Sequence, residues 1–363
     1  MTIHIFNPEH DIVLASGLSN FTAPHAGRQL RHDLGFLPAI WAQNGDVILV
    51  DDVEHAERAY RKLAFRLHSI LGNERLYESR RVFLSSHRPL PAVTPESINP
   101  WGWNNALKAM LLRRGASPTL LPDDQQLQTI RQLSHRRTAA ALLPKLRING
   151  TVGEAFECTT EKQIEALQAQ YGQLMMKAPW SSSGRGLRFL SEKYNLQNSL
   201  CLSGWFHNLL ASQGSVMVEP YYNKVKDFGM EFCSDGKGNV SYMGLSLFST
   251  ANGAYTGNIL ATETVKTQMM ANYLPVDLLE TTKDCICREL GKIFNGTYAG
   301  LFGIDMMVVG NGDSFLLHPC VEINLRHTMG HVANTIAPTD DDLQAVMRIE
   351  YTDNYYKLKI NKL

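Results

Sequence analysis

The chain has 363 residues, of which 44% are hydrophobic and 19% charged, so it can bury a large core and has the length of two or three domains. Lys+Arg and Asp+Glu both number 35, and this zero net charge excludes a global field that would favour nucleic acid or an anionic membrane. No stretch approaches the roughly 18 apolar residues of a membrane span, and the first residues resemble a strand rather than a leader. We therefore expect a cytoplasmic protein whose six cysteines, which lack CxxC spacing, are reduced thiols.

Residues 1–120 have the pattern of an α/β domain. Short apolar strands are predicted at Ile3–Phe6, Val47–Val50 and Arg81–Leu84. A helix with apolar residues at 3 and 4 spacing is predicted between the second and third strands, from Asp52 to Gly72. Alternating strands and helices of this kind indicate a largely parallel sheet.

Two polar or aromatic segments of this region are candidates for contacts beyond the domain. Asn7–Asp11 follows a strand end, where open α/β sheets bind ligands, so His10 and Asp11 are candidate substrate contacts. A polar turn with satisfied hydrogen bonds is the alternative that the composition favours. Trp101 and Trp103 are predicted to be packing anchors at a domain junction.

Residues 174–190 predict a phosphate-binding loop between two strands. The apolar strand Leu174–Lys177 ends in a lysine, Ser181–Gly186 is a serine-glycine loop, and Leu187–Leu190 resumes as a strand. Small residues allow several backbone N–H groups to converge on an anion, and the lysine adds a point charge. The loop lacks the GxxxxGK[ST] pattern and the third glycine of a dinucleotide fingerprint, so a plain hairpin loop is the alternative.

The stretch Phe315–Arg326 predicts a strand with one apolar and one polar face. Alternation places Glu322 and Asn324 on the polar face, together with His318, Cys320 and Arg326. Glu322 and Asn324 would lie about 6–7 Å apart, within reach of one Mg2+ ion. Asp305 lies on the preceding strand, which turns back at Asn311-Gly312, so it would join the same site. A face that is merely solvated is the alternative.

The order of these segments resembles the ATP-grasp superfamily between about Ser134 and Met329. The motifs that carry the resemblance are MMKAPWSSSGRG, VMVEPYY and VEINLR. The resemblance implies an α/β and α+β fold, with an N-terminal α/β domain before a two-lobed ATP-grasp fold built on antiparallel sheets. The implied boundaries are 1–120, then 121–219 for the small nucleotide-binding lobe, and 220–363 for the large lobe with the metal site and a C-terminal helix or tail.

The resemblance also implies a role for each matching residue. Lys177 would bind phosphate and act in catalysis together with Arg326, which steadies the transferred phosphate or the substrate carboxylate. Either Arg136 or Arg137 would replace the family's earlier phosphate-binding lysine, an exchange that keeps the charge but changes the geometry. The remaining implied ligands of ATP are Ser183, Gly184, Gly186, Glu219, Tyr221 and Asp227, and those of Mg2+ are Asp305, Glu322 and Asn324.

The function implied by the resemblance is an ATP- and Mg2+-dependent ligase. It would activate a small-molecule carboxylate as an acyl phosphate for attack by an amine or thiol, releasing ADP and phosphate. The alternatives are a small-molecule kinase and a non-catalytic nucleotide-binding regulatory protein. Neither the substrates nor the oligomeric state follow from the sequence, and no nucleic-acid or membrane partner is expected. His327 and His331 lack the glutamate of HExxH, so we expect them at the acceptor end of the cleft rather than on zinc.

Overall fold

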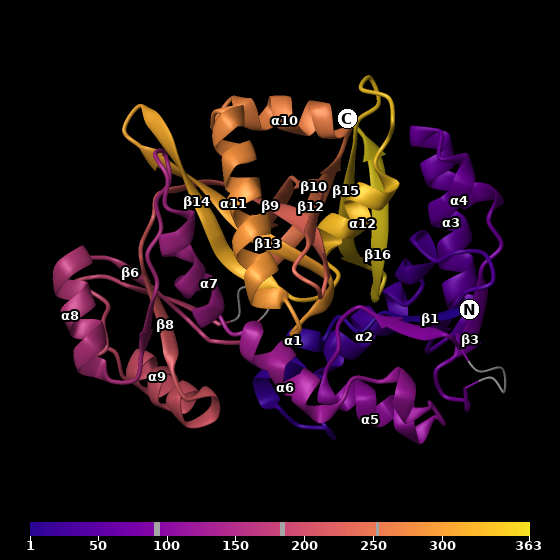
Figure 1. Cartoon of the computed structure of the whole chain (residues 1–363), viewed down its shortest axis with the longest axis horizontal. Helices are drawn as coiled ribbons and strands as arrows, with labels where there is room; N and C mark the ends of the chain where they lie inside the picture. Colours follow the sequence, from indigo (N-terminus) through magenta and orange to yellow (C-terminus); the bar gives the residue numbers. More distant parts are fainter. Residues whose placement is uncertain (91–94, 182–185, 252–253) are drawn as a thin grey trace.

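The computed structural model describes residues 1–90, 95–181, 186–251 and 254–363. It divides into three regions that follow one another along the chain and lie side by side (Figure 1). All six cysteines are free thiols, as expected. Within the described ranges, no helix is long and apolar enough to cross a membrane.

The N-terminal region is a four-stranded parallel sheet with the order β3-β2-β1-β4. Its strands are β1 (Thr2–Ile5), β2 (Val47–Val50), β3 (Val82–Ser85) and β4 (Ser97–Pro100). Its helices are α1 (His10–Ser16), α2 (His25–Leu34), α3 (Val53–Leu71), α4 (Glu74–Glu78) and α5 (Asn105–Arg113), with a short 3-10 turn η1 (Leu37–Ile40). The three predicted strands are confirmed. Strand β4 and helix α2 were not predicted, and His10 and Asp11 begin a helix rather than completing a turn.

The strand order reverses direction at β1. The chain runs outward from β1 to β2 and β3, and then returns past both to place β4 on the other side of β1. The segments that follow β1 and β4 therefore face each other at the carboxyl edge of the sheet. Such a switch point is where open α/β sheets bind ligands.

The small lobe is an antiparallel sheet with the order β5-β8-β6-β7, covered by two helices. Its elements are β5 (Phe156–Cys158), α8 (Glu161–Tyr171), β6 (Leu174–Lys177), β7 (Leu187–Leu190), α9 (Leu200–Gln213) and β8 (Val216–Pro220). The Thr160 side chain caps α8 in the predicted capping box, and Gly172 ends the helix.

The segment between the N-terminal region and the small-lobe sheet packs against the large lobe. It contains η2 (Pro118–Leu120), α6 (Asp124–Leu133), α7 (Arg137–Leu142) and η3 (Leu143–Leu146). Leu127, Leu142 and Leu146 belong to the same apolar core as the large-lobe strands. The apolar faces of α6 and α7 therefore join this part of the predicted small lobe to the large lobe.

The large lobe holds two antiparallel sheets, with the orders β10-β9-β13-β14 and β11-β12-β15-β16. The strands are β9 (Lys224–Asp235), β10 (Val240–Ser246), β11 (Phe248–Ala251), β12 (Ala254–Leu260), β13 (Ala299–Asn311), β14 (Ser314–Asn324), β15 (Ala345–Thr352) and β16 (Tyr355–Lys362). The helices are α10 (Glu263–Ala271), α11 (Val276–Phe294) and α12 (Met329–Ile336). The expected C-terminal helix or tail is α12 followed by a β-hairpin, which completes the second sheet.

Candidate active site

Arg136 joins the phosphate loop to the predicted metal strand. The side chain is buried, and its Nε donates to the carbonyl oxygen of Ala178 at 3.0 Å. Its Nη2 donates to Ser181 Oγ at 3.3 Å and forms an ion pair with Glu322 Oε2 at 2.8 Å. Arg137 instead lies 56% exposed and pairs with Glu157 at 3.0 Å. Of the two arginines that the sequence left open, Arg136 is therefore the one that faces the cleft.

Lys177 and Glu219 are partners of each other. They extend from the neighbouring strands β6 and β8, both are buried, and Lys177 Nζ lies 2.5 Å from Glu219 Oε2. The predicted phosphate lysine and the predicted hinge glutamate thus form one ion pair on the inner face of the small lobe.

His318 lies close to this pair, and the sequence analysis assigned no role to it. It is fully buried, and neither ring nitrogen has a hydrogen-bond partner. Its ring meets Tyr222 edge to face at 5.4 Å. Burial lowers the pKa of His318 to about 4, and this effect outweighs the charge of Glu219, which alone would raise the pKa; the charge of Lys177 makes a smaller contribution that lowers it.

The described ends of the phosphate loop approach each other closely. Ala178 N–H donates to the carbonyl oxygen of Gly186 at 2.8 Å. A Cβ on Gly186 would lie 2.6 Å from Ser181 Cβ, so this position requires glycine. Ser183 and Gly184 lie outside the described residues, and their predicted roles stay predictions.

Tyr221 and Asp227 lie closer to the surface. Tyr221 is 50% exposed, and its ring meets Phe189 at 4.9 Å. Asp227 Oδ2 accepts from Thr250 Oγ1 at 2.6 Å and from Lys224 Nζ at 2.7 Å. Their adenine and ribose roles stay predictions.

The predicted metal ligands lie on adjacent strands. Asp305 on β13 pairs directly with Glu322 on β14, and Asn324 follows two residues later opposite Gly303. Burial, together with the charges of Glu322 and Glu231, raises the pKa of Asp305 to about 7. Glu231, which the sequence analysis did not single out, lies on β9 beside Gly303, and a Cβ on that glycine would be 2.5 Å from Glu231 Oε2.

The predicted alternation of β14 is interrupted between His318 and Glu322, although both residues lie on the face that carries Asp305, as predicted. The register with β13 shifts between the pairs Asp305–Glu322 and Met307–His318, so β14 carries extra residues there. Pro319, which has no backbone N–H, lies within this irregularity. As a result, Cys320 is buried in the apolar core instead of extending the polar row.

Arg326 connects the predicted metal strand, β14, to the N-terminal region. Its Nε and Nη2 donate to the two oxygens of Asp11 at 2.9 and 2.8 Å, and Nη2 also donates to Asn324 Oδ1 at 2.8 Å. Burial alone would raise the pKa of Asp11, but the charge and hydrogen bonds of Arg326 outweigh it and lower that pKa. This bidentate pair aligns α1 with the end of β14.

A narrow cleft of about 10 Å³ lies where these elements meet, with room for about one water molecule. It is lined by residues from α1, from the start of the phosphate loop and from β14 and the residue after it. These are Asp11, Leu14, Ser134, Trp180, Ser181, Glu322, Ile323, Asn324 and Leu325. All three regions of the molecule therefore contribute to one site.

The segments after β1 and β4 are tied together at the switch point. Asn7 Nδ2 donates to the Gly102 carbonyl oxygen at 2.8 Å, and Gly102 N–H donates to Asn7 Oδ1 at 3.3 Å. His10 lies against Gly102, and its Nδ1 is 3.3 Å from Asn104 Nδ2. Its Nε2 is buried without a partner, and burial lowers the pKa of His10 to about 4.

His327 and His331 occupy different environments next to this edge. His327 stacks on Trp41 at 4.6 Å and on Trp101 at 5.8 Å, so Trp101 is at a junction between regions, as expected. His331 lies in the first turn of α12, where its Nδ1 is 3.2 Å from the backbone nitrogen of Thr328. Burial lowers the pKa of both rings, that of His331 to about 4.

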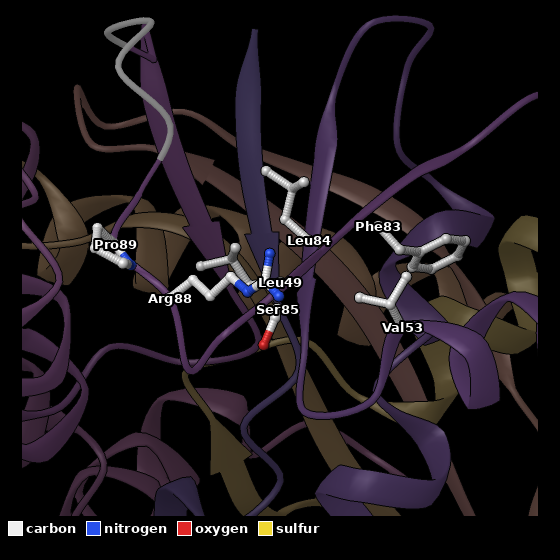
Figure 2. A pocket seen from close by; sticks show the side chains of 7 residues that line it. All are labelled: Leu49, Val53, Phe83, Leu84, Ser85, Arg88 and Pro89. Atoms are coloured by element: carbon white, nitrogen blue, oxygen red, sulfur yellow. The ribbon is translucent and has the colours of Figure 1, made fainter.

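A wider hollow of about 550 Å³ lies elsewhere, on the N-terminal region. Figure 2 shows its lining, in which Arg88 and Ser85 accompany apolar side chains from β2, β3 and the start of α3. It shares no lining residue with the narrow cleft. Since Glu322, which pairs with Arg136, and Asp11, which pairs with Arg326, both line the narrow cleft, we place the candidate active site there.

No protein-family profile matches the chain, and no curated protein matches it in sequence. Solved structures do match. The biotin carboxylase domain of 2-oxoglutarate carboxylase from Hydrogenobacter thermophilus, in complex with MgADP, ADP and bicarbonate, aligns at 13% identity and a TM-score of 0.52, over 88% of this chain and 72% of that one. Biotin carboxylase from Campylobacter jejuni, in a complex described as β-γ-ATP, aligns at 12% identity and a TM-score of 0.50, over 98% and 77%. N5-carboxyaminoimidazole synthetase from Staphylococcus aureus aligns at 13% identity and 0.48, over 96% and 82%.

Proposed function

We propose that this chain, whose fold is that of the ATP-grasp enzymes, is an ATP- and Mg2+-dependent ligase that joins a small-molecule carboxylate to an amine or thiol. The observation that carries the proposal is that Asp11 and Glu322 line one cleft between the three regions, each with an arginine as its ion-pair partner. Biotin carboxylase structures with the same fold contain MgADP and bicarbonate, or an ATP-type ligand.

The residues present fit a divalent cation. Asp305 and Glu322 face each other across paired strands, with the amide of Asn324 beside them and Glu231 nearby. Ionising these carboxylates together costs free energy, as the raised pKa of Asp305 shows, and a divalent cation removes that cost. A bound Mg2+ would supply positive charge to the phosphate oxygens of ATP.

The cations of the cleft would position the reacting groups. Lys177 lies directly before the predicted phosphate loop, Arg136 contacts Ala178 and Ser181 at its start, and both cations would bind the phosphates of ATP. Arg326, held in one orientation by Asp11, would orient the substrate carboxylate. Phosphoryl transfer depends mainly on positioning and charge neutralisation, which this arrangement supplies without a protein nucleophile.

The bonds change in two steps. A carboxylate oxygen of the substrate attacks the γ-phosphorus of ATP, and the bond from that phosphorus to ADP breaks to leave an acyl phosphate. The amine nitrogen, or the thiol sulfur, then attacks the acyl carbon. The bond from that carbon to the phosphate oxygen breaks, phosphate leaves, and the nucleophile loses its proton.

The fate of oxygen distinguishes the ligase from the alternatives. With a carboxylate substrate labelled with 18O, a ligase of this type releases one labelled oxygen in each phosphate, because the attacking oxygen stays on phosphorus. We therefore propose a screen of pooled carboxylates and amines for ADP release, followed by mass analysis of the phosphate. A kinase would leave a stable phosphorylated product, and a regulatory protein would bind ATP without turnover. Unlabelled phosphate with an active substrate pair would contradict the acyl phosphate.

A further inference from the structure

Three side chains far from the narrow cleft form a cluster with metal-ligand chemistry. In the described part of the chain, His32, Asp33 and His55 are the one group of three His, Cys, Asp or Glu residues whose donor atoms all lie within 4.8 Å of one another. His32 Nδ1 is 2.9 Å from Asp33 Oδ1, and the two imidazole centroids are 5.2 Å apart. His32 and Asp33 lie in the last turn of helix α2, and His55 lies in the first turn of α3.

Asp33 is the buried member of the cluster. Its side chain is fully buried, and among the described ion pairs its partner is His32, with no lysine or arginine. Gln29 donates to both carboxylate oxygens at 2.9 Å, and the backbone N–H of Tyr356 donates to Oδ2 at 2.7 Å. A buried carboxylate that has a histidine but no described lysine or arginine as its partner is a favourable anchor for a cation, and neutral donors already fix its orientation.

We propose that His32, Asp33 and His55 bind a divalent transition metal of the zinc type. Two imidazoles and one carboxylate form a ligand set that suits Zn2+ or Co2+ better than Mg2+, which prefers oxygen ligands. Metal bonds of about 2.0–2.2 Å require the donor atoms to move slightly closer together. The two histidines are partly exposed, which leaves their rings room for this movement.

Binding requires one change of tautomer. To ligate through Nδ1, His32 must carry its ring proton on Nε2 and give up its hydrogen bond to Asp33. His55 Nε2, 3.2 Å from the Asp33 carbonyl oxygen, can keep that hydrogen bond if His55 ligates through Nδ1. Asp52, whose Oδ1 accepts from the His55 backbone N–H at 2.9 Å, adds a further carboxylate next to the cluster.

The position of the cluster indicates a structural role. Strand β16 packs against α2 and α3, although it lies about 300 residues later in the chain (Figure 1). The rings of His55 and Tyr355 stack at 5.7 Å, and Tyr356 binds Asp33. A metal at this cluster would fasten the C-terminal hairpin to the N-terminal region, independently of nucleotide binding.

Co2+ is the probe that tests this site, because its visible absorption reports nitrogen and oxygen ligands and is lost when Zn2+ replaces it. We expect one equivalent of Co2+ per chain, displaceable by Zn2+, and a higher Tm with Zn2+ than with EDTA. His32→Gln and His55→Gln should each weaken Co2+ binding at least about tenfold and remove the Zn2+ effect on Tm. His55→Gln keeps a donor for the Asp33 carbonyl oxygen, so it preserves the packing.

Two control variants distinguish Co2+ binding at this cluster from Co2+ binding elsewhere on the protein. His25→Ala changes an exposed histidine of the same helix, and Glu322→Gln changes the predicted Mg2+ site. Both variants should still bind one equivalent of Co2+ and show the same visible absorption spectrum as the unaltered protein. Melting without metal checks that each variant folds. Absence of that spectrum in the unaltered protein, or equal Co2+ affinity in the folded His32→Gln and His55→Gln variants, would overturn the proposal.

Discussion

Each buried cation of the candidate active site has a carboxylate partner. Lys177 pairs with Glu219, Arg136 with Glu322, and Arg326 with Asp11. Because each charge is paired, the free-energy cost of removing it from water is lower than for an unpaired charge. The paired charges are also neutralised, so in the proposed function ATP would have to compete with the carboxylates for these cations. Residue changes at the carboxylates therefore test the site without removing the cations.

Glu322→Gln is the most informative of these changes. It removes one predicted Mg2+ ligand. It also weakens the ion pair with Arg136, so the guanidinium group becomes available to bind phosphate. We expect ATP affinity without Mg2+ to be unchanged or higher, while the gain in affinity on adding Mg2+ falls at least about tenfold and turnover is lost. Titration calorimetry of ATP with and without Mg2+ measures both quantities.

Glu157→Gln is the control, because Glu157 pairs with the exposed Arg137. It should leave the Mg2+-dependent gain unchanged. If Glu322→Gln retained the same gain as the unaltered protein, Glu322 would not be a metal ligand, and the main support for the ligase proposal would be removed.

Buried histidines predict how stability depends on pH. Burial lowers the pKa of His10, His135, His318 and His331 to about 4. In the unfolded chain a histidine has a pKa of about 6.5. Between these values the unfolded chain binds more protons, so the stability is complete above about pH 6.5 and is lost as the pH falls toward 4.

His318→Phe tests this dependence at one residue. The variant should reduce the loss of unfolding free energy between pH 7 and pH 5 by about 1–2 kcal/mol, because one titrating group is removed. Urea unfolding at the two pH values measures the loss. His87→Gln, at an exposed position, is the control and should behave like the unaltered protein. An unchanged loss in His318→Phe would show that His318 does not contribute.

At the scale of elements, α12 docks its N-terminus closely on β9. A Cβ on Gly330 would overlap the Glu231 carboxylate and the Ser246 hydroxyl. Thr328 and His331 form a capping box at the same end of the helix. The close approach places Glu231 under the first turn of the helix, where backbone N–H groups favour a negative charge.

Gly330→Ala should therefore destabilise the protein, by about 1–3 kcal/mol, because α12 or Glu231 must move. Gly204→Ala is the matched control within helix α9, since nothing lies within 4 Å of its added Cβ. That variant should be stabilised by about 0.5–1 kcal/mol, the ordinary gain of alanine over glycine in a helix. Urea midpoints compare the two, and equal shifts would contradict the docking.

At the scale of the whole molecule, one apolar core joins the two ends of the chain. Phe6, Leu37 and Leu67 of the N-terminal region share it with Met347 and Ile360 of the C-terminal hairpin. A second core joins α6 and α7 to the large sheet. The regions on either side of the cleft are thus connected through buried side chains, and we expect them to unfold together.

Ile360→Ala tests this connection. Ile360 is 2% exposed, so truncating it should cost about 2–4 kcal/mol of unfolding free energy. Tryptophan fluorescence, to which Trp41 and Trp101 of the N-terminal region contribute, and far-UV circular dichroism should shift together to the same lower Tm. Separate transitions by the two probes would show that the N-terminal region unfolds independently.

The sequence by itself determined the elements whose signals are local. The helix Val53–Leu71 is specified by apolar spacing and Gly72, the strands of the small lobe by short apolar runs, and the antiparallel pairing of β13 with β14 by the tight turn at Asn311-Gly312. Of the predicted metal ligands, Glu322 and Asn324 line the cleft, and their role as ligands stays a prediction.

The tertiary structure decided everything that depends on distant partners. Asp11 meets Arg326 across 315 residues, and Arg136 rather than Arg137 faces inward, because packing of α6 and α7 on the large sheet sets their orientation. The register shift of β14 buries Cys320, although strict alternation would expose it. The periodicity of the sequence indicates which face of an element is apolar, but the fold of the whole chain determines which partner covers that face.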